Sequence, residues 1–169
     1  MTDISDALWN DSIGPNDYAE THSAAYQATL LEQYKLCVEM ADRVSARRNL
    51  ANTFFLSLNS VVVVVLAALI GPLAQASAWL LLAGAIILAS VSLAWYAMVR
   101  SYRLLNGAKF AVVGAMEERL PAYAYSRAEW NELGEGKDWR RYLPLSHIEQ
   151  WVPLFFVAAY VIGFLALIL

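Results

Sequence analysis

Hydrophobic residues gather in two long blocks of this chain that carry no charge. The first block lies between Arg48 and Arg100, and the second follows Glu149. A helix of about 20 apolar residues crosses the hydrocarbon core of a bilayer. The first block is long enough for two such helices, and Gly71-Pro72 between them favours a tight turn. The predicted membrane spans are 51–70, 78–99 and 151–169.

Before the first block, apolar residues recur with the period of a helix. Tyr26, Leu30 and Tyr34 begin an apolar stripe along one face. The opposite face carries charged residues spaced three or four apart, namely Glu32, Lys35, Glu39 and Arg43. The pattern predicts an amphipathic cytosolic helix over 24–50. Because no Gly or Pro separates it from the first span, we expect one continuous helix over 24–70.

The segments outside the predicted spans are short. Residues 1–23 contain Asp and Glu but no Lys or Arg, and they predict an irregular acidic tail. Residues 100–149 begin with a helical pattern that stops at Pro121, and a loop-like stretch follows. Glu117, Glu118 and Arg119 are expected to form a solvated helix end. These segments are sufficient for one modest cytosolic layer but not for a separate catalytic domain.

Lys and Arg are confined to two segments of the chain. All twelve lie in 24–50 and 100–149. Loops rich in Lys and Arg stay in the cytosol, so we expect the N-terminus and the 100–149 segment there. The C-terminus is then expected on the opposite, periplasmic side. Trp95 and Trp151 are predicted to mark the inner interface, where aromatic residues collect.

Charged and nucleophilic residues form no recognisable reaction centre in the sequence. The predicted spans contain no acid or base, which disfavours a proton relay or an ion-coupled transporter. His, Cys, Asp and Glu show no zinc-site spacing, and the basic residues form no stripe that suits nucleic acid. We therefore expect a protein that is not an enzyme, with no catalytic or metal-binding residues, no cofactor and no nucleic-acid partner.

Polar and small residues within the spans are candidate helix contacts. Asn52 and Asn59 are seven residues apart, which places them on nearly the same face of the first span. Each amide predicts a hydrogen bond to another helix, as a contact that fixes the register between subunits. A pore lining and an amide satisfied near the interface are the alternatives. Small residues spaced four apart, which let helices approach closely, are Ala67 with Gly71 and Ala159 with Gly163.

Four stretches of the chain, taken together, resemble a known family. They lie at 34–48, at 51–59 (ANTFFLSLN), at 105–121 beginning LNGAKF, and at 130–153 ending IEQWVP. In content and order they are similar to the RipA family of octameric bacterial membrane proteins. The resemblance implies an inner-membrane homo-octamer without catalytic residues. It also marks candidate residues of a cytosolic face: Asn106, Lys109, Phe110, Trp130, Lys137, Tyr142 and Glu149.

The combined expectation is an all-α integral membrane protein with three transmembrane helices, a helical cytosolic layer and a homo-oligomeric assembly. The predicted function is a scaffold in the bacterial inner membrane that supports growth or stress adaptation through its cytosolic face. The predicted partners are membrane lipids, further copies of the chain and an unidentified protein. An oligomeric pore that conducts ions or solutes is the alternative.

Overall fold

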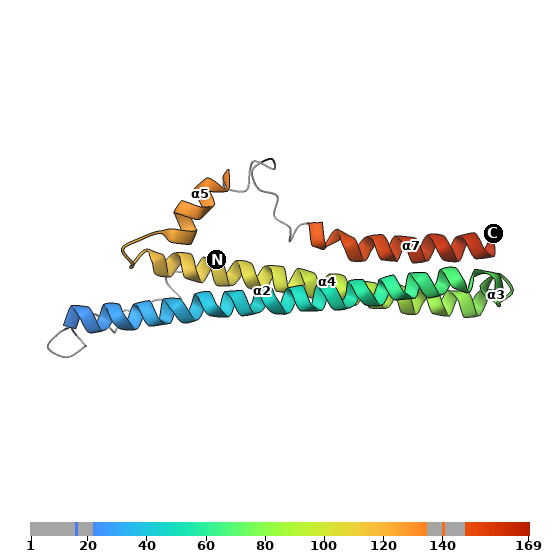
Figure 1. The fold of residues 1–169 in the computed structure, drawn as a ribbon, viewed down its shortest axis with the longest axis horizontal. Coiled ribbons are helices and arrows are strands. Elements are labelled where there is room, and N and C mark those ends of the chain that lie inside the picture. Colours follow the sequence, from blue (N-terminus) through green and yellow to red (C-terminus); the bar gives the residue numbers. More distant parts are fainter. Residues whose placement is uncertain (1–15, 17–21, 135–139, 141–147) are drawn as a thin grey trace. The chain divides into compact units, whose positions relative to one another are not determined.

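The computed structural model describes residue 16 and residues 22–134, 140 and 148–169. Most of these residues are helical, and none of them forms a strand. Three helices are long and apolar enough to cross a membrane, which confirms the predicted fold class: they lie within Ala24–Ala68, Ala78–Glu117 and Trp151–Ile168. Figure 1 shows them as the long helices α2, α4 and α7. The described residues belong to two compact units, 22–45 with 104–134 and 46–103 with 148–169.

Helix α2, His22–Ala68, is the longest element and runs without interruption for 47 residues. No Gly or Pro occurs within it, so every residue can adopt helical geometry and donate or accept in the backbone ladder. Two exposed ion pairs support its first half. Glu32 pairs with Lys35 and Glu39 with Arg43, both at 2.6 Å. Pairs at this spacing add about 0.2–0.5 kcal/mol each to a helix.

The connection after α2 is more helical than the sequence indicated. Gly71 and Pro72 lie inside a short helix, α3, which spans Ile70–Ala74. Pro72 occupies its first turn, where the missing N–H has no intrahelical partner to lose. Ser77 then precedes α4, and its Oγ lies 3.4 Å from the backbone N of Leu80. Helix α4, Ala78–Glu117, continues for 40 residues.

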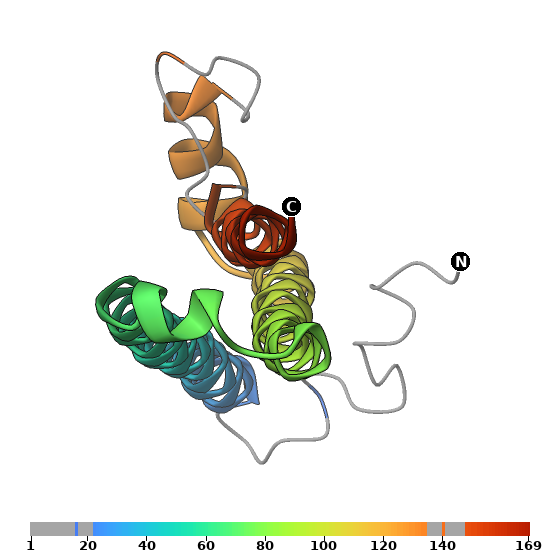
Figure 2. The same cartoon turned by 90° about the vertical axis from the view of Figure 1, so that its right-hand side faces the viewer.

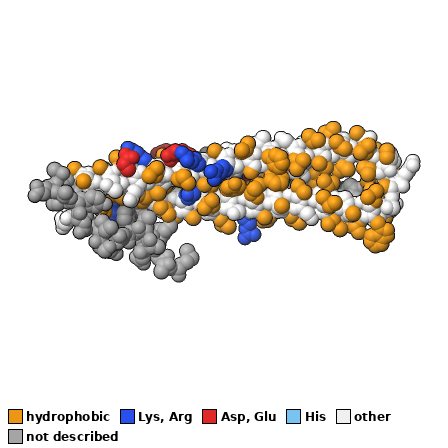
Figure 3. All heavy atoms as spheres, turned by 90° about the horizontal axis from the view of Figure 1, so that it is seen from below, with side chains coloured by type: hydrophobic (Ala, Val, Ile, Leu, Met, Phe, Trp, Pro, Cys, Tyr) orange, Lys and Arg blue, Asp and Glu red, His pale blue; other side chains and the backbone are white. Residues whose placement is uncertain are grey.

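The first unit to describe is the apolar unit, which comprises residues 46–103 and 148–169. Within it α7, Trp151–Ile168, lies beside α4, as the two views in Figures 1 and 2 agree. The side chains of Trp95, Asn59 and Ser92 are almost fully buried among its helices. Many large aliphatic residues are exposed on its outside, and Figure 3 shows hydrophobic side chains in orange over much of the visible face. Such a surface suits hydrocarbon, where exposed apolar side chains carry no penalty.

The second unit, the charged unit, comprises residues 22–45 and 104–134 among those described. Its core contains Leu30, Ala41 and Val44 from α2, and Val113 and Met116 from α4. After α4 the chain forms a π-helical segment, η2 (Ala124–Glu129), which continues into the short helix α5 (Trp130–Glu132). The sequence indicated only a loop in this segment. Tertiary contacts with the end of α4 account for the difference, because they fix its backbone.

Candidate functional site

The apolar unit contains a polar cluster centred on Asn59. Its side chain is 2% exposed, and its Nδ2 donates to the carbonyl of Phe55 at 2.8 Å. Its Oδ1 accepts hydrogen bonds from Ser92 Oγ at 3.1 Å and from Tyr160 Oη at 2.7 Å. Asn59 on α2 therefore joins α4 and α7 within one subunit. Whether it also contributes between subunits stays a prediction.

Asn52 forms a second link in the same unit. Its Oδ1 accepts a 2.8 Å hydrogen bond from the indole Nε1 of Trp95. Trp95 is 1% exposed, and its ring lies 5.9 Å from those of Phe55 and Phe156. Helices enclose the Trp95 ring, and its N–H is satisfied within the subunit. Its position at the level of the inner interface stays a prediction. Trp151 is 62% exposed.

The small-residue pairs face outward in the subunit. Ala67, Gly71, Ala159 and Gly163 are all exposed. A Cβ added at Gly71 or Gly163 would meet no atom within 4 Å. These positions leave room for another helix to approach, but the structure brings none of them together. Their role in oligomer contacts stays a prediction.

Glu149 is one of the candidate residues of the cytosolic face. It forms an ion pair with Arg48 in the apolar unit. Arg48 Nε lies 3.5 Å from Glu149 Oε2, and the two side chains are 16% and 21% exposed. Neither atom has a hydrogen-bond partner among the described residues. The two groups attract each other electrostatically, but the distance is too long for a direct hydrogen bond.

The charged unit contains a different polar cluster, centred on Glu117 at the end of α4. The Glu117 side chain is fully buried. Its Oε1 accepts from Tyr34 Oη and from the backbone N–H of Tyr125, both at 2.9 Å. Its Oε2 accepts from the backbone N–H of Ser126 at 2.8 Å and from Ser126 Oγ at 2.5 Å. One carboxylate thus binds α2 and the start of η2 to the end of α4.

The hydrogen bonds around Glu117 favour its ionised form. Burial alone raises the pKa of Glu117, but the bonds from Ser126, Tyr125 and Tyr34 outweigh it and lower the pKa below its ordinary value. Burial and the adjacent carboxylate raise the pKa of Tyr34 in turn. The expectation that Glu117 belongs to a solvated helix end was therefore wrong. A carboxylate with four donors is stable inside a protein because each replaces a water molecule.

Gly114 permits this arrangement, because it lies one turn before Glu117 on α4. A Cβ added there would lie 3.2 Å from the Cβ of Ser126. The absence of a side chain lets η2 approach α4 closely enough for Ser126 to reach the carboxylate. Beside it, the guanidinium of Arg127 lies 3.8 Å from the centre of the Tyr123 ring, at cation–π distance.

The other candidate residues of the cytosolic face include four that the structure describes, on α4 and α5. Phe110 on α4 and Trp130 on α5 are each 45% exposed, and Asn106 has a buried Oδ1 without a hydrogen-bond partner among the described residues. Lys109 is half-buried beside α2. Lys137 and Tyr142 lie outside the described residues. The role of these positions in a cytosolic face stays a prediction.

The sequence interpretation missed the residues that complete both clusters. Ser92 and Tyr160 gave no signal as single polar groups in apolar helices, although any hydroxyl in a membrane span needs a partner. Glu117 looked like its exposed neighbours. In the part of the chain that the structure describes, no three His, Cys, Asp or Glu residues are placed to hold a metal ion. In both clusters the polar groups form hydrogen bonds within the subunit, which is typical of a structural role.

Comparison with known proteins gives one informative match. Residues 31–169 match the model of a family described as the octameric membrane protein family, 8xMP. The match covers α2 from residue 31 onward and the whole of α4 and α7. No curated protein and no solved structure matches the chain.

Proposed function

Because this chain belongs to the octameric membrane protein family, we propose that it is a homo-octameric scaffold of the bacterial inner membrane. In this proposal it has no enzymatic activity, and it supports growth or stress adaptation by presenting its cytosolic face to an unidentified protein. The similarity to the RipA family supports the bacterial inner membrane and the physiological role. Membrane lipids surround the apolar unit.

The proposed orientation places the charged unit in the cytosol. All twelve Lys and Arg residues lie in 24–50 and 100–149, and the positive-inside rule assigns such segments to the cytosol. The connection that contains α3 and the C-terminal end of α7 carry no charge. They would lie on the periplasmic side.

The observation that carries the scaffold proposal is the internal use of polar groups in the membrane spans. The amides of Asn52 and Asn59 both bond within the subunit, to Trp95 and to Ser92 with Tyr160. The outer faces of the spans present aliphatic side chains such as Val61, Val64 and Ile162, with small hydroxyl residues such as Ser57 and Ser90 among them. A path lined by such residues favours dewetting rather than ion conduction.

On the proposed cytosolic face, η2 and α5 have the features of a protein-binding surface. The Glu117 cluster holds η2 in one position, and Tyr125 and Trp130 on η2 and α5 remain 39% and 45% exposed. Exposed aromatic residues on a fixed segment are typical of protein contact sites, because they bury much area at little entropic cost. We assign the partner contact to this segment.

The decisive experiment compares conduction by the purified, reconstituted protein with growth of cells that produce each variant. Wild-type octamers are expected to give no current across planar bilayers. Trp130→Ala is expected to keep the octamer but not to restore growth in cells that lack the wild-type protein. Leu31→Ala, which removes a similarly exposed apolar side chain (42%) from α2, is the matched control for Trp130→Ala.

The alternative, an oligomeric pore, is tested by polar substitutions in the first span. Val63→Asn and Val64→Asn place amides at two exposed positions of α2. Wild-type current whose ion selectivity changes with these substitutions would replace the scaffold proposal with the pore. A silent wild type together with a Trp130→Ala defect would support the scaffold.

A further inference from the structure

The two units expose hydrophobic side chains to different surroundings. Around the apolar unit the surroundings are lipid chains, which are as apolar as leucine and therefore give helices no hydrophobic reason to associate. The charged unit carries exposed ion pairs of Glu32 with Lys35 and Glu39 with Arg43, which do not belong in hydrocarbon. Hydrophobic side chains exposed on this unit meet water, and covering them is favourable.

The charged unit has such hydrophobic side chains along one groove between α2 and α4. The groove has a volume of about 310 Å³, and its lining residues are Leu36, Cys37, Met40, Ala108, Lys109 and Val112. Leu36 and Met40, one turn apart on α2, are 59% and 45% exposed. On α4, Gly107 and Ala108 are exposed, and a Cβ added at Gly107 would meet no atom within 4 Å. The groove is therefore open, mostly apolar and shallow along α4.

We infer that this groove receives a neighbouring copy of the chain in the octamer. The inference rests on the proposed orientation, which places the charged unit in water. The family description requires each subunit to contact other copies. The span amides Asn52 and Asn59 already bond within the subunit, so they leave less for subunit contacts than the sequence indicated. The water-exposed groove supplies the association energy that lipid-facing surfaces lack.

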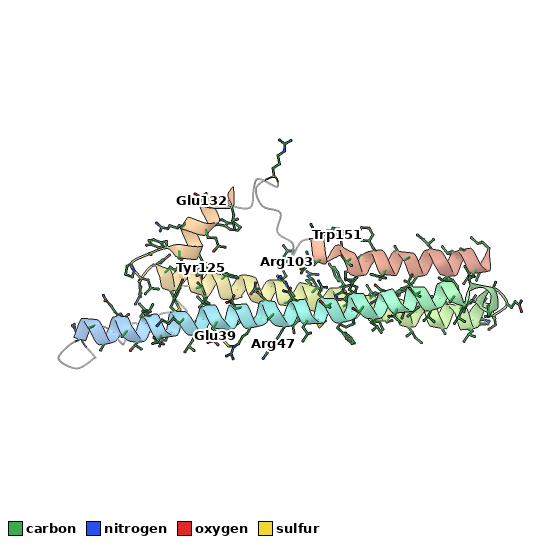
Figure 4. The ribbon with its side chains drawn as sticks, in the orientation of Figure 1. Glu39, Arg47, Arg103, Tyr125, Glu132 and Trp151 are labelled. Atoms are coloured by element: carbon green, nitrogen blue, oxygen red, sulfur yellow. The ribbon has the colours of Figure 1, made fainter. Side chains whose placement is uncertain are left out.

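A neighbouring copy suits the groove better than a charged ligand does. Five of the six lining residues are uncharged, and Lys109 is the single cation among them. The charged residues of α2 lie along the edge of this lining, because Glu39 and Arg43 each follow a groove residue by three positions. Figure 4 shows Glu39 on α2. The groove thus offers an apolar contact area with a polar margin, which is the usual construction of a subunit interface.

Two substitutions in the groove test the inference on full-length protein in mild detergent. Met40→Glu adds a charge that would be buried without a partner, and Ala108→Trp fills the space that the neighbour would occupy. Both variants are expected to lose the octamer in mass photometry and to run as smaller species. Ala28→Glu and Ala28→Trp are matched controls. Ala28 is exposed on α2. It lies eleven residues, or about three full turns, before Glu39, so it shares the charged face of α2 and does not line the groove.

Cys37, the single cysteine of the chain, reports on the same groove without any substitution. Maleimide labelling of its thiol is expected to be slow in the octamer and fast after dissociation. Deletion of residues 1–21 is expected to leave labelling slow, because the neighbour and not the chain's own tail covers the groove.

Three results would overturn the inference: intact octamers in both groove variants, equal losses in the Ala28 controls, or rapid labelling of Cys37 in octamers with or without residues 1–21. None of these results depends on conduction or on the growth phenotype. If the groove proves not to be a subunit interface, the scaffold proposal is unaffected. If the wild-type protein conducts ions, the assignment of the groove as a subunit interface is unaffected.

Discussion

The hydroxyl of Tyr34 on α2 donates a 2.9 Å hydrogen bond to the carboxylate of Glu117 on α4, although 83 positions separate the two residues. The same carboxylate accepts three further hydrogen bonds from Tyr125 and Ser126. Two helices and η2 therefore depend on one ionised side chain. Hydrogen bonds to charged groups contribute about 1.5–3 kcal/mol each, more than neutral ones.

Replacing Glu117 by Gln should release η2 from α4. The amide of Gln keeps one acceptor oxygen, but its NH₂ group faces the N–H and hydroxyl of Ser126, which are also donors. Loss of one charged hydrogen bond of about 1.5 kcal/mol corresponds to roughly tenfold more frequent local opening. Trypsin should therefore cleave after Arg127 about tenfold faster in Glu117→Gln than in the wild type.

Glu118→Gln is the matched control for this experiment, because Glu118 is the exposed neighbour of Glu117. It should leave cleavage after Arg127 unchanged. Equal cleavage rates in Glu117→Gln and wild type would mean that packing alone holds η2 in place.

Acidification should open the same contact. The lowered pKa of Glu117 means that its stabilising contribution is fully present above the ordinary value of 4.5 and is lost as the pH falls below it. The raised pKa of Tyr34 has the opposite sign, so its contribution is present below the ordinary value of 10.0 and is lost in strong alkali.

Hydrogen exchange of residues 124–132, corrected for the intrinsic pH dependence, measures this effect. Protection should be constant from pH 6 to 8 and fall in acid below the ordinary carboxyl pKa, since protonation removes the ionised acceptor (~1.4 kcal/mol for each pH unit). Glu117→Gln should show no such fall. Protection in the wild type that stays constant down to pH 3 would contradict the assigned role of Glu117.

The apolar unit allows a quantitative test of the Asn59 cluster. Hydrogen bonds between membrane helices contribute about 0.6 kcal/mol on average and up to about 1.7 kcal/mol. Asn59→Leu and Tyr160→Phe should each lower the unfolding temperature of the protein in detergent. The double variant should be less destabilised than the sum of the two, because both remove the same bond.

Ser90→Leu is the control for these variants, since Ser90 is exposed on α4 and should change the unfolding temperature little. Strict additivity of Asn59→Leu and Tyr160→Phe would argue against a stabilising bond between them. If Asn59→Leu left the unfolding temperature unchanged but reduced the fraction of octamers, Asn59 would act at contacts between subunits.

Topology reporters test the proposed orientation directly. A reporter that works only in the cytosol should be active when fused after Asp17 or at Lys137. One that works only in the periplasm should be active after Leu169. The expected result follows from the confinement of Lys and Arg to 24–50 and 100–149. Activity of the cytosolic reporter after Leu169 would require an even number of crossings.

The fold was largely predictable because it depends on local properties of the chain. The absence of charge between Arg48 and Arg100 and after Glu149 suffices to predict three long apolar helices, and the structure confirms them. The octameric family was also recognisable from the order of several short stretches, while the RipA assignment stays a proposal.

The polar clusters were less predictable because distant residues complete them. Glu117 stands beside Glu118 and Arg119, which predicts exposure. Yet its carboxylate bonds to Tyr34, 83 positions earlier, and to Ser126, nine positions later. The sequence does suggest hydrogen bonds for Asn52 and Asn59. It does not indicate that Trp95 and Tyr160 supply them, since aromatic residues near a span end are equally typical of an interface.

The Asn59 cluster also bears on how the protein enters the membrane during synthesis. Ribosomes make α2 and α4 before α7, so the helical hairpin exists for a time without Tyr160. In that interval Asn59 Oδ1 has only the Ser92 hydroxyl as its donor among the described cluster residues. Until α7 arrives, the amide oxygen retains a free lone pair for the Tyr160 hydroxyl. Docking of the third helix then completes a hydrogen bond in hydrocarbon, which gives the last insertion step a preferred register.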